Sequence, residues 1–323
     1  GKTVACLPLA FLHDVLPKMK LSAKWAPVLQ PDPVTPEPAD HAKKLEEMLS
    51  RLNICSKEYV VRQYDHEVQG GSVVKPLVGE FCDGPSDAGV IRPVLESLQG
   101  VVVSNGIAPR YSDIDTYHMT ACALDEGLRN YVCAGGNPDR WACLDNFCWC
   151  DPVKSERNPD GEHKLAQLVR SNRALYDYTR IYRCPLISGK DSMKNDYIGP
   201  DVKISIPPTI LVSVIGRIDD ITKAVTMDAK RAGDIVYLLG VTRKELGGSE
   251  FFASFGITGS SVPKVDAQEA LARYRKLHGA MGRSLIASAH DLSDGGLAVA
   301  LAEKAFAGNL GLSVDLGAVR TEG

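Results

Sequence analysis

The sequence predicts a mixed α/β or α+β protein built of two domains. The chain has 323 residues, and about 150 residues are typical of one domain. Segments with strand character alternate with amphipathic helical segments along most of the chain, which is typical of α/β and α+β folds. The hydrophobic fraction of 44% and the charged fraction of 24% are those of a globular chain with buried cores.

The first two thirds of the chain contain most of the predicted elements. The proline-rich stretch that ends at Pro38 is expected to be an extended linker, because proline fixes φ and removes a hydrogen-bond donor. Helices are predicted from apolar residues at helical spacing, the first of them with Asp40 as its N-cap and the second ending before Gly135. They lie at 42–52, 118–133 and 165–182. Strands rich in β-branched and aromatic residues are predicted at 59–64, 101–104, 184–188 and 209–216.

A second unit is predicted to begin near Asp219. Its expected elements are a strand at 234–240, a helix at 267–281, a strand at 284–289 and a helix at 297–307 that ends at Gly308. The strand at 209–216, just before this unit, is a continuous apolar run and is therefore expected to be buried on both faces.

Charge and hydropathy exclude several classes of protein. The formal net charge is −3, so the basic excess typical of nucleic-acid-binding proteins is missing. No run of about 18 apolar residues predicts a membrane span, and the N-terminus lacks the apolar block of a signal peptide. The nine cysteines include a dense group at 143–150 without the second half of a zinc site, and we expect reduced thiols in a cytoplasmic protein. The ends of the chain, Gly1 and Gly323, indicate a piece of a longer protein.

The segment 187–194, Ile-Ser-Gly-Lys-Asp-Ser-Met-Lys, is the first candidate site. Gly189 would let a backbone approach a phosphate closely, Lys190 can neutralise phosphate charge, and Asp191 can bind Mg²⁺. It is not a P-loop, because the upstream glycine and the Ser or Thr directly after the lysine are missing. An ordinary polar turn remains the alternative.

Three further segments carry candidate residues. In 288–297, a glycine pair opens a helix whose free N–H groups favour an anion, and the alternative is a helix start capped by Ser293 or Asp294. In 144–152, two carboxylates, an asparagine and aromatic cover suit Mg²⁺ held with nucleotide phosphates, and the alternative is a turn. In 245–252, a functional loop and a turn capped by Ser249 are equally compatible with the residues.

Together and in this order, the motifs resemble the second half of phosphoribosylformylglycinamidine synthase, an ATP-dependent ligase of purine synthesis. The resemblance covers nearly the whole chain from about residue 55 onward. Its most specific stretches are 61–69 (VRQYDHEVQ), 108–111 (APRY), 123–130 (ALDEGLRN), 144–147 (LDNF), 189–192 (GKDS), 225–230 (VTMDAK), 246–250 (LGGSE) and 290–297 (HDLSDGGL).

The resemblance implies an architecture of two fused halves, each with a ferredoxin-like domain followed by an α/β domain (the PurM-like architecture of aminoimidazole ribonucleotide synthetase). Residues 1–45 would be the tail of the preceding α/β domain and a linker. Residues 46–218 would form the ferredoxin-like N-terminal-type domain, and residues 219–323 a truncated α/β C-terminal-type domain. The family converts formylglycinamide ribonucleotide to formylglycinamidine ribonucleotide with ATP, Mg²⁺ and ammonia from glutamine.

The resemblance also implies roles for residues. Asp145, Gly189 and Lys190 would contact ATP, and Ser192 would reach the substrate. In some relatives the residue at the position of Lys190 binds the metal, and here Asp191 would bind it instead. A secondary anion or nucleotide site would comprise His290, Asp291, Ser293, Asp294, Gly295 and Gly296. Catalytic residues are expected in the missing first half, so none of the seven histidines is assigned that role.

Expected partners are the first half of the same enzyme and a glutaminase domain or subunit, with neither nucleic acid nor membrane. The isolated chain is expected to be inactive and to form a homodimer, because its sheet would otherwise be left unpaired. Two alternatives remain: a stand-alone ATP enzyme of the same superfamily (aminoimidazole ribonucleotide synthetase, selenophosphate synthetase or thiamine-phosphate kinase type), and a structural half without nucleotide.

Overall fold

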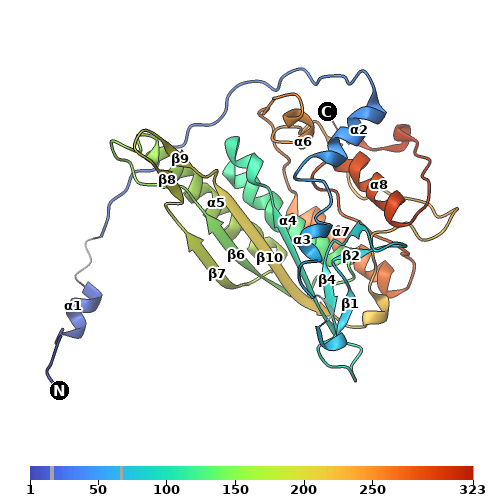
Figure 1. The fold of residues 1–323 in the computed structure, drawn as a ribbon, viewed down its shortest axis with the longest axis horizontal. Coiled ribbons are helices and arrows are strands. Elements are labelled where there is room, and N and C mark those ends of the chain that lie inside the picture. The colour runs from blue at the N-terminus through green and yellow to red at the C-terminus, as the bar shows by residue number, and fades with distance from the viewer. Residues whose placement is uncertain (15–17, 66–67, 323) are drawn as a thin grey trace.

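The computed structural model describes residues 1–14, 18–65 and 68–322. The fold has two units, and a six-stranded sheet forms the centre of the larger one. The strand order is β1-β4-β5-β10-β6-β7 (Figure 1). The pair β6–β7 is parallel and the other neighbours are antiparallel. The strands are β1 (Ser72–Val74), β4 (Gly89–Ile91), β5 (Gly100–Ile107), β10 (Thr209–Ile218), β6 (Trp141–Cys148) and β7 (Leu186–Ser192). The strands predicted at 101–104, 184–188 and 209–216 are therefore confirmed, and the second continues to Ser192.

Two long helices, α4 (Thr116–Cys133) and α5 (Gly161–Tyr182), cover one face of this sheet (Figure 1). Both were predicted, with starts a few residues later. The Asp115 side chain caps α4 by accepting a hydrogen bond from the Tyr117 N–H at 2.8 Å. Leu124 and Leu128 on its inner face are fully buried, and burial of each such side chain stabilises the fold by about 1.5–3 kcal/mol. Gly135, with φ of +97°, follows the end of the helix.

The contact between β5 and α4 is unusually close. A Cβ on Gly106 would overlap the Ala123 carbonyl oxygen, so only glycine fits at this strand position. Next to it, the Ser104 hydroxyl donates to the Gly127 carbonyl at 2.7 Å in the buried layer. This contact fixes the rotation of α4 and thereby directs the segment 125–129 toward the second unit.

The other face of the sheet is not covered by any described helix. Along β10, buried residues alternate with partly exposed ones, and Ile215 on the open face is 40% exposed. Val103, which pairs with Ile215 in the neighbouring strand, is 45% exposed. The expectation that 209–216 is buried on both faces is therefore wrong for this chain, because helices pack on only one side.

The second unit consists mainly of α6 (Glu250–Ala253), α7 (Ala267–Gly282) and α8 (Gly296–Ala307). The helices predicted at 267–281 and 297–307 are confirmed. Helix α7 packs on both α4 and α5, so the two units share a contact layer. Short paired strands complete the fold: β2 (Leu77–Val78) with β3 (Gly84–Pro85), β8 (Asp196–Ile198) with β9 (Lys203–Ser205), and β11 (Thr242–Arg243) with β12 (Thr321–Glu322).

Three predicted strands are absent from the described residues. Segment 59–64 overlaps a short helix, α3 (Glu58–Val61), in which the Arg62 N–H donates to the Glu58 carbonyl at 2.9 Å. Segments 234–240 and 284–289 have no regular secondary structure, and Tyr237 and Leu285 are 76% and 67% exposed. Strand propensity reflects packing against neighbours, and no described strand pairs with these three segments.

The N-terminal region contains α1 (Leu9–Asp14), an extended stretch and α2 (His41–Ser50), which Asp40 caps as predicted. The extended stretch crosses both units (Figure 1). Trp25 stacks on the His163 ring with centroids 5.2 Å apart. Asp32 accepts hydrogen bonds from the backbone N–H groups of Ser260 and Ser261 at 2.7 and 3.0 Å. The predicted linker is thus docked on both units, and residues 18–40 are called the strap below. No described helix is long and apolar enough to cross a membrane.

Candidate functional site

Asp145 and Gly189, 44 positions apart in the chain, lie directly opposite each other in the parallel pair β6–β7. A Cβ at position 189 would overlap the Asp145 carboxylate oxygen Oδ1, so glycine leaves the space that this side chain occupies. The structure therefore brings together two of the residues that the sequence suggested for ATP.

Asp191 lies on the same face as Asp145, because residues two apart in a strand point to the same side of the sheet. The pKa of the Asp145 carboxyl is raised above its ordinary value, mainly by burial and also by the negative charge of Asp191. Two carboxylates that repel each other in this way have the charge and the oxygen donors that suit Mg²⁺.

Lys190 and Ser192 point to the opposite face of β7, where the Lys190 ammonium donates a hydrogen bond to the Ser192 hydroxyl. The segment forms the edge strand of the sheet and not a turn, and Gly189, Lys190 and Asp191 are all exposed. It lies outside both of the cavities described below. The five candidate residues thus fall into two groups, on opposite faces of one accessible edge.

His290, in the second candidate site, is held between two carboxylates from different parts of the chain. Its Nδ1 lies 2.7 Å from Asp87 Oδ1 and its Nε2 lies 2.9 Å from Glu303 Oε2. Although burial lowers it, these two hydrogen bonds raise the pKa of His290 to about 10. Potential ligand atoms of Asp87, His290 and Asp291 lie within 4.8 Å of one another, but a protonated imidazole has no lone pair for a metal.

Asp291 and Asp294 follow on the loop that leads into α8. Burial and the charge of Asp87 raise the pKa of Asp291 to about 6, against the opposing charge of Arg129. Burial and the charge of Glu250 raise the pKa of Asp294 to about 6. Ser293 is exposed, and Gly295, with φ of +89°, precedes α8 without a side-chain cap. The alternative of a helix start capped by Ser293 or Asp294 is therefore wrong, since glycine in a left-handed conformation begins the helix, and Gly296 follows with φ of +64°.

A buried network joins this loop to the helices of the larger unit. The Asp125 carboxylate accepts hydrogen bonds from the Tyr182 and Tyr274 hydroxyls at 2.5 and 2.6 Å. Its other oxygen pairs with Arg129, whose Nη2 lies 3.3 Å from Asp291 Oδ2 and 3.2 Å from the Leu292 carbonyl. Helices α4, α5 and α7 thus meet at the Asp125 carboxylate, and Arg129 connects it to the loop 290–294.

Sequence reasoning did not assign roles to Asp87, Asp125, Glu126 or Arg129. The carboxylate of Glu126 accepts the Ile107 N–H at 2.8 Å, and burial together with the charge of Asp291 raises its pKa to about 7. For Asp125, Glu126 and Arg129, the available signal was the dense acidic and basic pattern within 123–130. Which of these charges face the loop 290–294 follows from the rotation of α4, and the sequence does not reveal that rotation.

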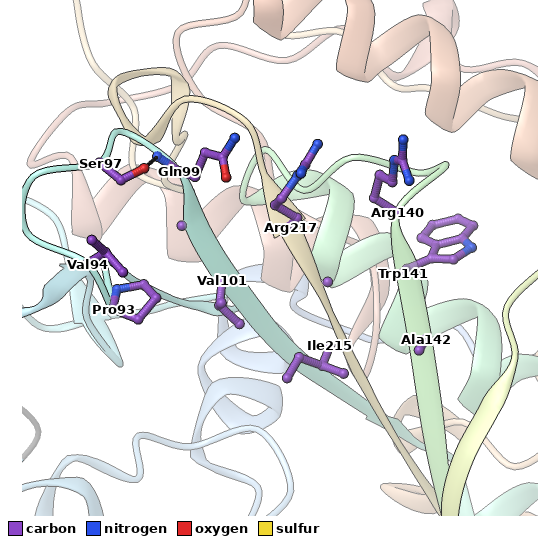
Figure 2. A pocket seen from close by; sticks show the side chains of 12 residues that line it. Pro93, Val94, Ser97, Gln99, Val101, Arg140, Trp141, Ala142, Ile215 and Arg217 are labelled. Carbon is purple, nitrogen blue, oxygen red and sulfur yellow. Dashed lines mark hydrogen bonds between the residues drawn. The ribbon is translucent and has the colours of Figure 1, made fainter.

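A cavity of about 550 Å³ lies on the open face of the sheet. Figure 2 shows Val101, Ala142 and Ile215 at its floor and the side chains of Arg140 and Arg217 at its rim. Arg217 pairs with Asp219 at 2.7 Å. An apolar floor with a basic rim is typical of a surface that another molecule covers.

Two family models match neighbouring parts of the chain. Residues 85–218 match the model of the N-terminal domain of AIR synthase related proteins, and residues 231–323 match that of their C-terminal domain. The phosphoribosylformylglycinamidine synthase subunit PurL of Thermoplasma volcanium is 35% identical over 284 residues, which cover 88% of this chain and 35% of that protein. PurL of Alkaliphilus metalliredigens is 36% identical over 282 residues, covering 87% of this chain and 35% of that protein.

A solved structure of PurLQS from Thermotoga maritima is 26% identical and covers 53% of this chain and 25% of that chain. Its TM-score of 0.40 is too low to support a comparison of folds. The chain spans about a third of the length of the two curated relatives. The two domain matches and the relatives together show that the chain belongs to the AIR synthase related proteins and, within them, to the PurL-type phosphoribosylformylglycinamidine synthase family.

Proposed function

We propose that this chain is part of the ATP-dependent ligase that converts formylglycinamide ribonucleotide to formylglycinamidine ribonucleotide, with ammonia derived from glutamine. Family membership and the names of the relatives support the reaction. The single observation that carries a nucleotide role for this chain is the register that sets Asp145 beside Gly189 at an exposed sheet edge. A stand-alone enzyme is less well supported, because the chain matches a third of a longer subunit.

In this proposal, Asp145 and Gly189 contact ATP, and Asp191 holds Mg²⁺ with Asp145 on the same face of the sheet. Lys190 contacts ATP from the opposite face of the same exposed edge strand. Ser192 contacts the substrate, while the loop 290–296 forms a secondary anion site. Phosphoryl transfer depends mainly on positioning and charge neutralisation, which these residue types supply. The catalytic residues would come from the first half of the enzyme, and a glutaminase domain or subunit would supply ammonia in the cytoplasm.

Lys190→Gln is expected to weaken binding of Mg·ATP about tenfold or more, since hydrogen bonds to charged groups contribute about 1.5–3 kcal/mol. Isothermal titration calorimetry on the purified chain measures this directly. Lys276→Gln is the matched control, because Lys276 is an exposed lysine on α7. Absence of Mg·ATP binding by the unmodified chain would favour the structural half without nucleotide. The chain alone should release no phosphate from ATP with formylglycinamide ribonucleotide and ammonium.

We further infer that the isolated chain forms a homodimer through the open sheet face. Val103 and Ile215 lie side by side on this face and are 45% and 40% exposed. A stable dimer buries about 800 Å² on each partner, and an uncovered sheet face offers such a surface. Light scattering should give twice the chain mass, and Ile215→Asp should give a monomer. Val169→Asp, on an exposed position of α5, should leave the dimer intact. A monomeric unmodified chain at high concentration would contradict this inference.

A further inference from the structure

A second cavity, of about 440 Å³, lies where three parts of the chain meet. The end of α2 and the residues after it form one wall, Arg110 of the larger unit forms another, and the start of α6 forms the third. The lining is polar apart from one leucine: Ser50, Arg51, Leu52, Asn53, Arg110 and Glu250. A volume of this size is within the range of small-molecule sites.

Glu250 organises the cavity. Its side chain is 2% exposed, and it accepts hydrogen bonds from Arg51 Nε and, at 2.6 Å, from the Asn53 amide. Arg110 Nε lies 2.9 Å from Glu250 Oε1, the oxygen that also accepts from Asn53. Although burial raises it, the hydrogen bonds from Arg51 and Asn53 and the charge of Arg110 hold the pKa of Glu250 below its ordinary value. The carboxylate is therefore ionised at neutral pH.

Both arginines contact Glu250 through Nε. Their Nη groups make no hydrogen bond to any residue in the described ranges, and both side chains line the cavity. Among the lining residues, two arginines against one carboxylate leave one positive charge, which the Asp294 carboxylate, with a pKa of about 6, opposes from outside the lining. Asp294 lies near enough to Arg110 and Glu250 to feel both charges, but it does not line the cavity. The arrangement offers two guanidinium groups, fixed by one buried carboxylate, to an anion.

We propose that the cavity formed by Arg51, Arg110 and Glu250 binds the phosphate group of a small polar phosphate monoester. The planar guanidinium group matches the geometry of phosphate oxygens and donates in pairs. The volume exceeds that of a phosphate ion alone, and the polar lining suits a hydroxylated carbon chain. The lining has no aromatic side chain on which a base could stack. This site goes beyond the proposed ligase function, because it shares no residue with 145 and 189–192.

Calorimetric titration of the full chain with ribose 5-phosphate, inorganic phosphate and ribose tests the proposal. Ribose 5-phosphate should bind, ribose should not, and inorganic phosphate should bind more weakly than the ester. Arg51→Gln and Arg110→Gln should each weaken binding about tenfold or more, as expected for a charge-assisted phosphate contact. Arg51→Lys keeps the charge next to Glu250 and should bind with intermediate affinity. Arg173→Gln, which removes an exposed arginine of α5, should bind as the unmodified chain does.

Three results would overturn the proposal: no binding of the ester, equal binding of ribose, or unchanged affinity in both glutamine variants. Equal affinity for inorganic phosphate and the ester would contradict the monoester assignment. The test separates this site from the ligase proposal, because Lys190→Gln should leave ribose 5-phosphate binding unchanged. An unmodified chain that binds the ester but not Mg·ATP would contradict the ligase site alone.

Discussion

Asp125→Ala is expected to lower the free energy of unfolding by about 3–5 kcal/mol, the cost of leaving one partner of a buried ion pair alone. The carboxylate of Asp125 accepts both tyrosine hydroxyls and pairs with Arg129. The substitution leaves the buried hydroxyls of Tyr182 and Tyr274 without their acceptor. Arg129 keeps Asp291 but loses Asp125 as an ion-pair partner. Chemical denaturation followed by circular dichroism measures the change.

Asp139→Ala provides the control for Asp125→Ala. Asp139 pairs with Arg275 at 2.6 Å, but its side chain is 61% exposed, and such surface pairs contribute about 0–1 kcal/mol. Tyr274→Phe removes a single hydroxyl from the same network and should cost about 1.5–3 kcal/mol. A destabilisation by Asp125→Ala as small as that of Asp139→Ala would mean that the network does not hold the two units together.

The second large effect concerns the pH dependence of stability through His290. Its pKa is about 10 in the folded chain against an ordinary value of 6.5, and a raised pKa stabilises the folded state while the ring is protonated. This contribution is fully present below pH 6.5 and is lost as the pH rises to 10. A tenfold gain in proton affinity on folding corresponds to about 1.4 kcal/mol, so the whole contribution is a few kcal/mol.

His290→Gln removes this titration and leaves the other alkaline titrations in place. The free energy of unfolding of the unmodified chain should exceed that of the variant most near pH 6, and the difference should shrink toward pH 10. Denaturant midpoints measured at pH 6, 8 and 10 for both proteins give this difference. A difference that stays constant with pH would show that Asp87 and Glu303 do not bind a protonated ring.

The helices could be predicted because each carries its own signals. Asp40 and Asp115 cap α2 and α4, and the buried faces of α4, α5 and α7 repeat at helical spacing. Strands depend on neighbours that a single sequence does not specify. The strand at 101–104 forms because β4 and β10 flank it, whereas segment 234–240 has comparable apolar character and no described partner strand.

The candidate site was only partly predictable for the same reason. Motifs identified Asp145 and Gly189 separately, and their direct pairing follows from the register of β6 and β7. Asp191 and Lys190 lie on opposite faces because the strand extends to Ser192. The sequence alone left a turn at this segment as an alternative. Arg51 and Glu250 are 199 positions apart and meet only through the packing of α2 against the second unit.

The strap also sets a limit on how far the two units can separate. Trp25 is fixed on α5 and Asp32 on the turn at 260–261, with seven residue steps between them. A fully extended chain spans at most about 3.5 Å per residue, so this tether can reach about 25 Å. A hinge motion that moves His163 and Ser260 farther apart than this must first break the contact of Trp25 or that of Asp32. The strap therefore limits how far the two units can open.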